Sequence, residues 1–287
     1  MVQITPQLVK ELREKTSAGM SDCKKALVEA NGDLKEAIEI LRKKGAASAA
    51  KRSDRSANEG IVISKVNESS SEAAIVELNC ETDFVARNQD FVDYAEKLVN
   101  TVLNTKVKTM EELLNQKISD DTVQDIHNEI LAKFSENISI RRFEFIESKG
   151  YIANYIHPGS RLSVLVELSC KNPNEKAKSL IHDIAMQIAA MNPSYISRDD
   201  VQSEHLQKEI EIYKEHAINE GKKPEIAERI AQGRIEKFFQ EQCLLEQAFV
   251  KDAAKTVKDV VDEISKEMEA EIKILSFRRY FLGESLD

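Results

Sequence analysis

The chain contains one internal repeat, and this repeat limits the possible folds more than any other feature. Residues 60–100 begin with GIVISKVNESSSEAAIVELNC, and residues 150–192 begin with GYIANYIHPGSRLSVLVELSC. In each copy two runs of alternating apolar and polar residues flank a turn, and an amphipathic helical stretch follows. Cys80 and Cys170 close the second run of each copy, 90 residues apart. The repeat predicts an α+β fold with two related core subdomains, each a β-hairpin followed by a helix.

Two segments outside the copies are expected to complete the sheets. Between the copies, residues 109–134 have a helical pattern, and the alternation from Ile138 to Phe145 predicts a further strand. Near the end, EIKILSFRRYFLGES predicts a last strand that returns to the body of the protein.

Three short helices are expected before the repeat, within residues 5–45. Helix-start residues occur at Thr5, Ser21 and Asp33, and Gly45 is expected to end the third helix. Such a bundle buries only a small core, which is typical of a docking module. It resembles the three-helix domain of the ubiquitin-associated (UBA) type, so a peptide-binding bundle is an alternative function.

The next segment, KKGAASAAKRSDRSANEG, lacks apolar periodicity and predicts a solvated, partly helical tether. Its basic residues Lys51, Arg52 and Arg55 could contact RNA, as could Arg141 and Arg142. The net charge of −9 disfavours this alternative, because an acidic chain repels phosphate backbones on average.

From about residue 199 the apolar residues form a narrow seam instead of a broad face. Their spacing of three and four residues continues on both sides of a Gly/Pro turn, which predicts an antiparallel coiled-coil hairpin that projects as an arm. The predicted seam residues are Leu206, Ile210, Tyr213 and Ala217 on the first helix and Ile226, Ile230 and Gly233 on the second.

These patterns divide the chain into four parts. Residues 1–55 are expected to form the UBA-like module with its basic linker, and residues 56–145 the first core subdomain. Residues 146–198 and 238–287 together are expected to form the second core subdomain, with the hairpin at 199–237 inserted between them.

Composition narrows the functional classes. Hydrophobic residues make up 41% of the chain and charged residues 32%, which is typical of a soluble globular protein. A signal peptide and a membrane-spanning run are not apparent, and the four widely spaced cysteines are expected to be reduced thiols, so a cytoplasmic location is expected. The sequence has no phosphate-binding glycine loop, nucleophile elbow or zinc motif, and it predicts no enzyme, cofactor or metal site.

The turn after Cys80 differs from its counterpart in the second copy. It reads ETDFVARNQD, whereas KNPNEKAKSL follows Cys170. If the fold required apolar residues at this place, the second copy would be expected to carry them too. Two interpretations remain open. Either Thr82 caps a helical turn and Phe84 packs into the local core, or the segment presents an apolar wedge to a partner.

Several motifs, in series along nearly the whole chain, closely resemble the bacterial elongation factor Ts family. They are LVKELREKTSAGMSDCKKALVEANGDLKEAIEILRKKG, TDFVARN after VELNC, YIHPGSRLSVLVEL, HDIAMQIAAMNP, GKKPEIAERIAQGRIEKF and LLEQAFVKD. Ser17 and Ser21 depart from the glycine and methionine commonest in the family, and Ala248 departs from its usual proline. The additional C-terminal helix of some members is not expected after FRRYFLGES. These departures bear on affinity rather than on membership.

The resemblance implies a guanine-nucleotide exchange factor for the GTPase elongation factor Tu in translation elongation. In the family, the TDFV segment enters the GTPase beside its bound Mg²⁺, which assigns partner binding here to Thr82, Asp83, Phe84 and Val85. Displacement of the metal leaves the phosphates of GDP poorly neutralised, so GDP dissociates faster and GTP can bind. The chain itself is expected to bind neither nucleotide nor nucleic acid.

The resemblance gives weaker expectations elsewhere. It places the first module, with Met20, on the outer face of the GTPase domain, although Met20 could instead pack within the module's own core. His157, in the HPGSR turn, resembles a position near the partner interface, although its own pattern is more typical of an ordinary turn residue. His182, on an apolar helix face, is expected to be a core histidine. The arm is compatible with a 1:1 complex or with self-association that gives a 2:2 complex.

Overall fold

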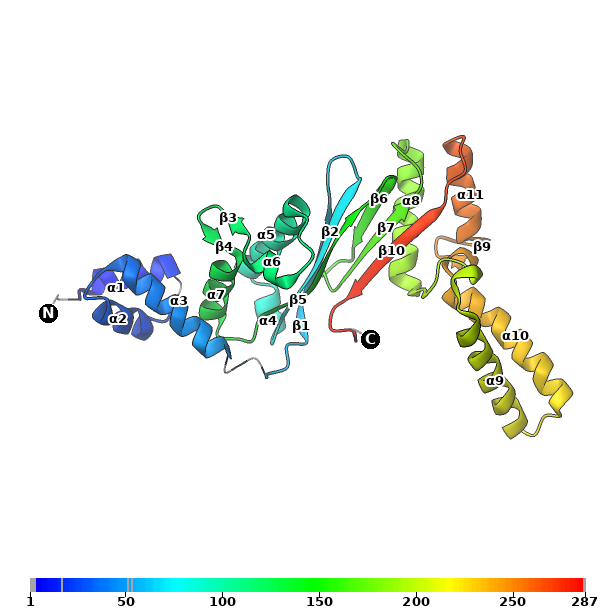
Figure 1. Cartoon of the computed structure of the whole chain (residues 1–287), viewed down its shortest axis with the longest axis horizontal. Coiled ribbons are helices and arrows are strands. Elements are labelled where there is room, and N and C mark those ends of the chain that lie inside the picture. The colour runs from blue at the N-terminus through cyan, green and yellow to red at the C-terminus, as the bar shows by residue number, and fades with distance from the viewer. Residues whose placement is uncertain (1–3, 17, 51, 53, 286–287) are drawn as a thin grey trace.

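The computed structural model describes residues 4–16, 18–50, 52 and 54–285, with the backbone alone for residues 46–50. The molecule is elongated: a three-helix module lies at one end, two sheets with their helices form the middle, and a helical hairpin extends from the other end (Figure 1). The predicted α+β class is confirmed. Among the described residues, no helix is both long and apolar enough to cross a membrane.

The first copy of the repeat contributes to an antiparallel sheet with strand order β1-β2-β5. Alternate side chains of β2 point into a core beneath the helix α5, whose Phe91, Tyr94 and Leu98 are fully buried. The elements are β1 (Glu59–Val66), β2 (Glu72–Cys80), β5 (Ser139–Glu147), the one-turn helix α4 (Asp83–Ala86) and α5 (Gln89–Thr105).

The segment between α5 and β5 is less helical than the sequence pattern predicted. Thr109 and Thr122 each start a new helix through a capping box, and a two-stranded ribbon separates the two helices. The elements are α6 (Met110–Leu114), β3 (Lys117–Ile118), β4 (Asp121–Thr122) and α7 (Val123–Phe134).

The second copy contributes to a second antiparallel sheet, with strand order β10-β7-β6. Its last strand is the C-terminal segment, which returns to the body as predicted. Two helices, α8 and α11, cover one face and share its apolar core. The elements are β6 (Tyr151–Ile156), β7 (Leu162–Leu168), β10 (Ile274–Phe281), α8 (Glu175–Met191) and α11 (Val257–Glu267).

The two sheets pack against each other through their inner faces. The first sheet contributes Val62, Ala73 and Ile75, and the second side contributes Ile152, Leu165, Tyr280 and Leu282. Since side chains alternate along a strand, β2 is buried on both faces, with one set of residues under α5 and the other against the second sheet. A polar residue of β2 on the face toward the second sheet, such as Glu77, therefore needs hydrogen-bonding partners within this interface.

The N-terminal module consists of α1 (Pro6–Thr16), α2 (Met20–Glu29) and α3 (Leu34–Ala50). Thr5 and Asp33 start helices as predicted: Thr5 Oγ1 accepts from Leu8 N at 3.2 Å, and Asp33 Oδ1 accepts from Glu36 N at 3.0 Å. The prediction for Ser21 is wrong, because Gly19 occupies the capping position and Met20 is already helical. Ser17 lies outside the described residues.

Gly45 does not end α3, contrary to the prediction. The helix continues to Ala50, and its second half crosses α7. A Cβ atom at Gly45 would lie 2.8 Å from the Cβ of Ala132, so glycine allows the two helices to approach closely. The first half of the predicted tether is therefore helical, and Gly45 within it packs against α7.

The arm is a hairpin of two helices, α9 (Ser203–Asn219) and α10 (Pro224–Gln242). On α9 the predicted residues face the partner helix, with Ala217 fully buried. On α10 the prediction is displaced: Ile226 is exposed, and the buried residues are Ala227, Ala231, Ile235 and Phe239. Small alanines allow the two backbones to approach, whereas the prediction followed the bulkier isoleucines. The remaining short elements are η1 (Arg198–Asp200), η2 (Leu244–Glu246), β8 (Ala248–Phe249) and β9 (Asp252–Thr256).

Candidate functional site

The turn after β2 is held by two helix caps that follow each other closely. Thr82 has an extended backbone (φ −125°, ψ 152°), and its Oγ1 accepts from Val85 N at 3.4 Å at the start of α4. Asn88 caps the next helix, α5, by accepting from Asp90 N at 3.0 Å. Because each cap fixes where a helix begins, the four residues of α4 have one defined orientation on the strand end.

This orientation buries one apolar residue of α4 and exposes its neighbour. Val85 is 8% exposed and belongs to the core beneath α5, whereas Phe84 is 84% exposed. The interpretation that Thr82 caps the turn is confirmed, and the interpretation that Phe84 packs into the core is wrong. Because Val85 is buried, a partner could contact little of it. Phe84 therefore provides most of the exposed apolar surface of the segment. An exposed aromatic ring held in one orientation can serve as the contact that a partner protein buries.

Two further groups define the electrostatics of the turn. Asp83 lies in the first turn of α4 and forms an ion pair with Arg87 at 3.0 Å, and both side chains are well exposed. Beneath them, burial and then the charge of Glu136 raise the pKa of Cys80 to about 12. Cys80 therefore stays a thiol, and its Sγ donates to the carbonyl oxygen of Thr82 at 3.2 Å. All four cysteines are free and buried.

The other predicted contact residues lie on separate elements. Met20 is the first residue of α2, is 47% exposed, and borders a groove with Pro6, Lys10, Arg13 and Glu14, so it is not part of the module core. His157 is exposed in the turn between β6 and β7, with its Nδ1 2.9 Å from the hydroxyl of Tyr155.

The prediction for His182 is wrong. His182 lies on the exposed side of α8 and packs against the ring of Tyr155. The adjacent Asp183 is the buried polar residue instead, and its Oδ1 accepts from Lys251 Nζ at 2.6 Å. The buried face of α8 includes Ile181, Ile184 and Ile188 and leaves His182 outside it.

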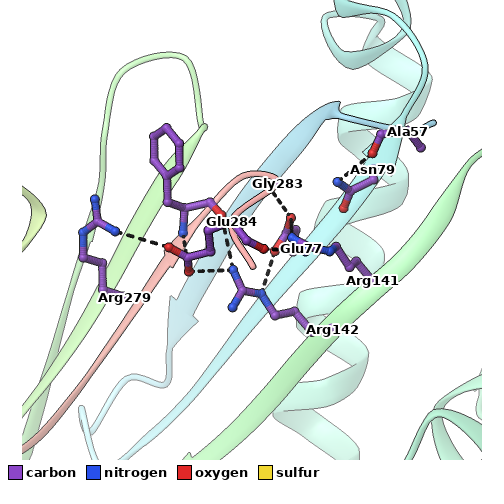
Figure 2. A network of polar contacts seen from close by, with 9 residues as sticks. Ala57, Glu77, Asn79, Arg141, Arg142, Arg279, Gly283 and Glu284 are labelled. Atoms are coloured by element: carbon purple, nitrogen blue, oxygen red, sulfur yellow. Dashed lines mark hydrogen bonds and ion pairs between the residues drawn. The ribbon is translucent and has the colours of Figure 1, made fainter. Parts of the chain in front are cut away.

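The basic residues considered for RNA binding are engaged within the fold. Glu77 of β2 is completely buried and binds Arg141 Nη1 at 2.9 Å and Arg142 Nε at 2.6 Å (Figure 2). Arg52 donates to the carbonyl oxygen of Leu131, and Arg55 forms an ion pair with Glu81. Lys51 lies outside the described residues. The described basic residues on which the RNA alternative rests thus have partners within the protein.

The Glu77 cluster also joins the C-terminal end to the first sheet. The Gly283 amide donates to Glu77 at 2.9 Å, and Arg142 donates to Glu284 at 2.8 Å (Figure 2). Burial alone would raise the pKa of Glu77, but hydrogen bonds from Gly283 and Arg141 and the charge of Arg142 hold it below its ordinary value. Sequence reasoning missed this cluster; the only signal was a carboxylate inside the apolar run AAIVELNC.

Within the described part of the chain, no group of three or more His, Cys, Asp or Glu side chains is arranged to hold a metal ion. The site is thus an exposed aromatic side chain on a rigid turn at the edge of an α+β core, a type of site that suits contact with another macromolecule.

Comparison with known proteins identifies the family. The model of the family "Elongation factor TS" matches residues 81–284. A protein named Elongation factor Ts from Clostridium kluyveri is 50% identical over 288 residues, and one from Clostridium perfringens is 48% identical over 286 residues. Each alignment covers 99% of this chain and 94% of the relative. The chain belongs to the elongation factor Ts family of translation elongation factors.

Proposed function

We propose that the chain is the guanine-nucleotide exchange factor of elongation factor Tu, and that Phe84 is its central contact residue. The observation that carries the proposal is the exposed side chain of Phe84. It lies on a turn that is capped by Thr82 and anchored by the buried residues Cys80 and Val85. A partner that buries this ring removes its apolar surface from water, which stabilises the complex.

In this mechanism Phe84 inserts between elements of the GTPase that hold the water shell of its Mg²⁺. Mg²⁺ requires near-ideal octahedral geometry, so a small displacement of these elements weakens its binding. Asp83 and its ion-pair partner Arg87 are exposed and can exchange their mutual contact for polar groups that the insertion frees. Thr82 and Val85 act from beneath, as the cap and the buried anchor of the turn. No covalent bond forms or breaks, so the protein acts by coupled binding and not as an enzyme.

The rest of the molecule supplies docking surfaces in this proposal. The UBA-like module, within residues 1–55, contacts the GTPase through the exposed Met20, and His157 contacts it from the turn of the second sheet. Separate apolar clusters support the division into this module and core subdomains at 56–145 and at 146–198 with 238–287. The coiled-coil hairpin, proposed at 199–237, shares its cluster with Phe239 and Cys243 at its base. The place of action is the cytoplasm, where translation occurs.

The proposal is tested by GDP release from elongation factor Tu loaded with a fluorescent GDP. We expect the wild-type chain to accelerate release, and Phe84→Ala to lower the maximal rate by about thirtyfold, the effect of losing a hot spot of about 2 kcal/mol. Phe281→Ala is the matched control, because Phe281 is also an exposed phenylalanine but lies at the end of β10. No acceleration by the wild-type chain would contradict the proposed function, and equal rates for the two variants would remove Phe84 from it.

A further inference from the structure

A carboxylate from a distant part of the chain holds the start of the exposed turn. Glu136, between α7 and β5, accepts hydrogen bonds through its Oε2 from Glu81 N and from Thr82 N, each at 3.1 Å. Its Oε1 accepts from Thr82 Oγ1 at 2.7 Å. Hydrogen bonds to an ionised acceptor are the stronger kind, and three of them converge here on two consecutive residues.

The contact is reciprocal. Glu81 Oε1 accepts from Asn137 N at 2.6 Å, while Arg55 Nη1 lies 3.4 Å from the same oxygen. The ladder between β2 and β5 ends at the pair Asn79 and Ser139, so the amides of residues 81, 82 and 137 lie beyond its last pair. The two carboxylates therefore serve as acceptors where the sheet no longer supplies them.

The hydroxyl of Thr82 links this contact to the helix that carries Phe84. It donates to Glu136 and accepts from Val85 N, so the carboxylate sets the direction in which the hydroxyl lone pairs point. Without Glu136 the hydroxyl is free to rotate, and the first turn of α4 loses part of its cap.

The second copy of the repeat closes its strand end in another way. Ser169 N donates to the carbonyl oxygen of Lys273 at 2.9 Å, and Lys273 N donates to Ser169 Oγ at 2.9 Å. Ser169 corresponds to Asn79 in the repeat. The residues that correspond to Glu81 and Thr82 are Lys171 and Asn172, which are exposed and bind no carboxylate within the part of the chain that the structure describes. The Glu136 contact accompanies the turn that exposes a phenylalanine, and the fold of the repeat does not require it.

We propose that Glu136 is a positioning residue for nucleotide exchange: it fixes Thr82 so that α4 begins at Asp83 and Phe84 points away from the core. This inference rests on the function proposed for Phe84. Glu136 acts through Thr82 and Val85, and the side chain that enters the partner is that of Phe84.

The first test needs no partner. Hydrogen–deuterium exchange is measured on peptides that cover residues 80–88, for the wild-type chain, Glu136→Ala, Glu136→Gln and the control Glu111→Ala, which removes an exposed carboxylate on α6. We expect about tenfold faster exchange of the turn amides in Glu136→Ala, because acceptors that bind two of them are lost. Glu136→Gln keeps one acceptor oxygen, so it should be intermediate, and Glu111→Ala should match the wild type.

Amides in the centre of β2 serve as the internal reference and should exchange at the wild-type rate in every variant. If Glu136→Ala does not fold, the nearly isosteric Glu136→Gln decides the test alone. Unchanged protection of residues 81–85 in a folded variant would overturn the proposal.

The second test separates positioning from binding. In GDP release from elongation factor Tu, we expect Glu136→Ala to lower the maximal rate about tenfold while the half-saturating concentration changes less than about twofold. In Phe84→Ala, the added Glu136→Ala substitution should cause little further loss, because both act through one side chain. A full rate in Glu136→Ala beside a reduced rate in Phe84→Ala would overturn the inference and leave the proposed function intact. If the wild-type chain did not accelerate release, the proposed function would fail, and the exchange of the turn amides would still decide the role of Glu136.

Discussion

The turns that follow Cys80 and Cys170 occupy equivalent places in the repeat and are built differently. Each follows a strand and a buried cysteine, which is the last residue of β2 in the first copy and lies two residues beyond β7 in the second. Each precedes a helix with an asparagine cap, Asn88 in one copy and Asn174 in the other. Only the first inserts an extra helical turn, and that turn exposes Phe84. The strand, the cysteine and the capped helix are thus what the fold needs. The exposed phenylalanine is an addition, which is why a partner explains it better than packing does.

We expect the largest difference in stability between the two copies when the glutamates of VELNC and VELSC, Glu77 and Glu167, are substituted. Glu77 is buried with two arginines, whereas Glu167 is half-buried and accepts from the Ser276 hydroxyl at 2.8 Å. We expect Glu77→Gln to lower the free energy of unfolding by about 3 kcal/mol, because it leaves buried arginine charge uncompensated. Glu167→Gln should cost less than about 1 kcal/mol. Denaturant unfolding of both variants measures the difference, and equal losses would show that the C-terminal clamp contributes little.

The next difference lies within the turn itself. Val85→Ala removes two buried methyl groups and should lower the free energy of unfolding by about 2 kcal/mol. Phe84→Ala removes an exposed ring and should change it by less than about 0.5 kcal/mol. Urea titrations measure the free energy of unfolding of both variants and of the wild-type chain. A loss of 3 kcal/mol or more, roughly that of a core phenylalanine, in Phe84→Ala would mean that the ring packs against the protein in solution.

A smaller difference concerns acid stability. Burial lowers the pKa of His127, on α7 of the first subdomain, to about 4, whereas His182 of the second is exposed. Below its ordinary pKa of about 6.5 the unfolded state takes up a proton that the folded state refuses. Stability is therefore complete above pH 6.5 and declines as the pH falls toward 4, by about 1–2 kcal/mol at pH 5.

Unfolding measured at pH 7 and pH 5 tests this prediction. His127→Gln should remove much of the decline, while His182→Gln should keep it. Equal slopes for His127→Gln and the wild-type chain would place the acid-sensitive group elsewhere.

The sequence predicted the architecture well where periodicity and caps carry the information. The 90-residue repeat predicted both hairpins and their helices, and the returning strand was recognised from its alternation. The sequence-based prediction was wrong where packing between distant segments determines the structure. Gly45 looked like a helix end, yet its missing side chain allows α3 to cross α7. On the arm, close approach of the helices selects Ala227 over Ile226.

The position of the candidate site could be predicted from the sequence, but the orientation of its side chains could not. The contrast between the copies directed attention to residues 82–85, but a helix of four residues has too few positions for a pattern to show that Phe84 is exposed and Val85 buried. The support from Glu136, fifty-four residues away from Thr82, depends on tertiary contacts that no local motif encodes.

In the proposed mechanism the turn acts through the Mg²⁺ of the GTPase, and this can be tested by thermodynamic linkage between the binding of the two proteins and the binding of Mg²⁺. If the protein favours a partner state with a disrupted metal site, GDP and Mg²⁺ must weaken its binding by the same coupling free energy. Each 1.4 kcal/mol of coupling changes the affinity about tenfold. Titration calorimetry of the chain against elongation factor Tu with GDP, at several Mg²⁺ concentrations, measures this coupling.

We expect the affinity of the wild-type chain for elongation factor Tu with GDP to fall as the Mg²⁺ concentration rises. In a variant with Asp83→Ala and Phe84→Ala this dependence should flatten, and by more than binding to the nucleotide-free partner is weakened. An unchanged Mg²⁺ dependence in the double variant would contradict the account, because the turn would then only dock and another contact would drive the release of GDP.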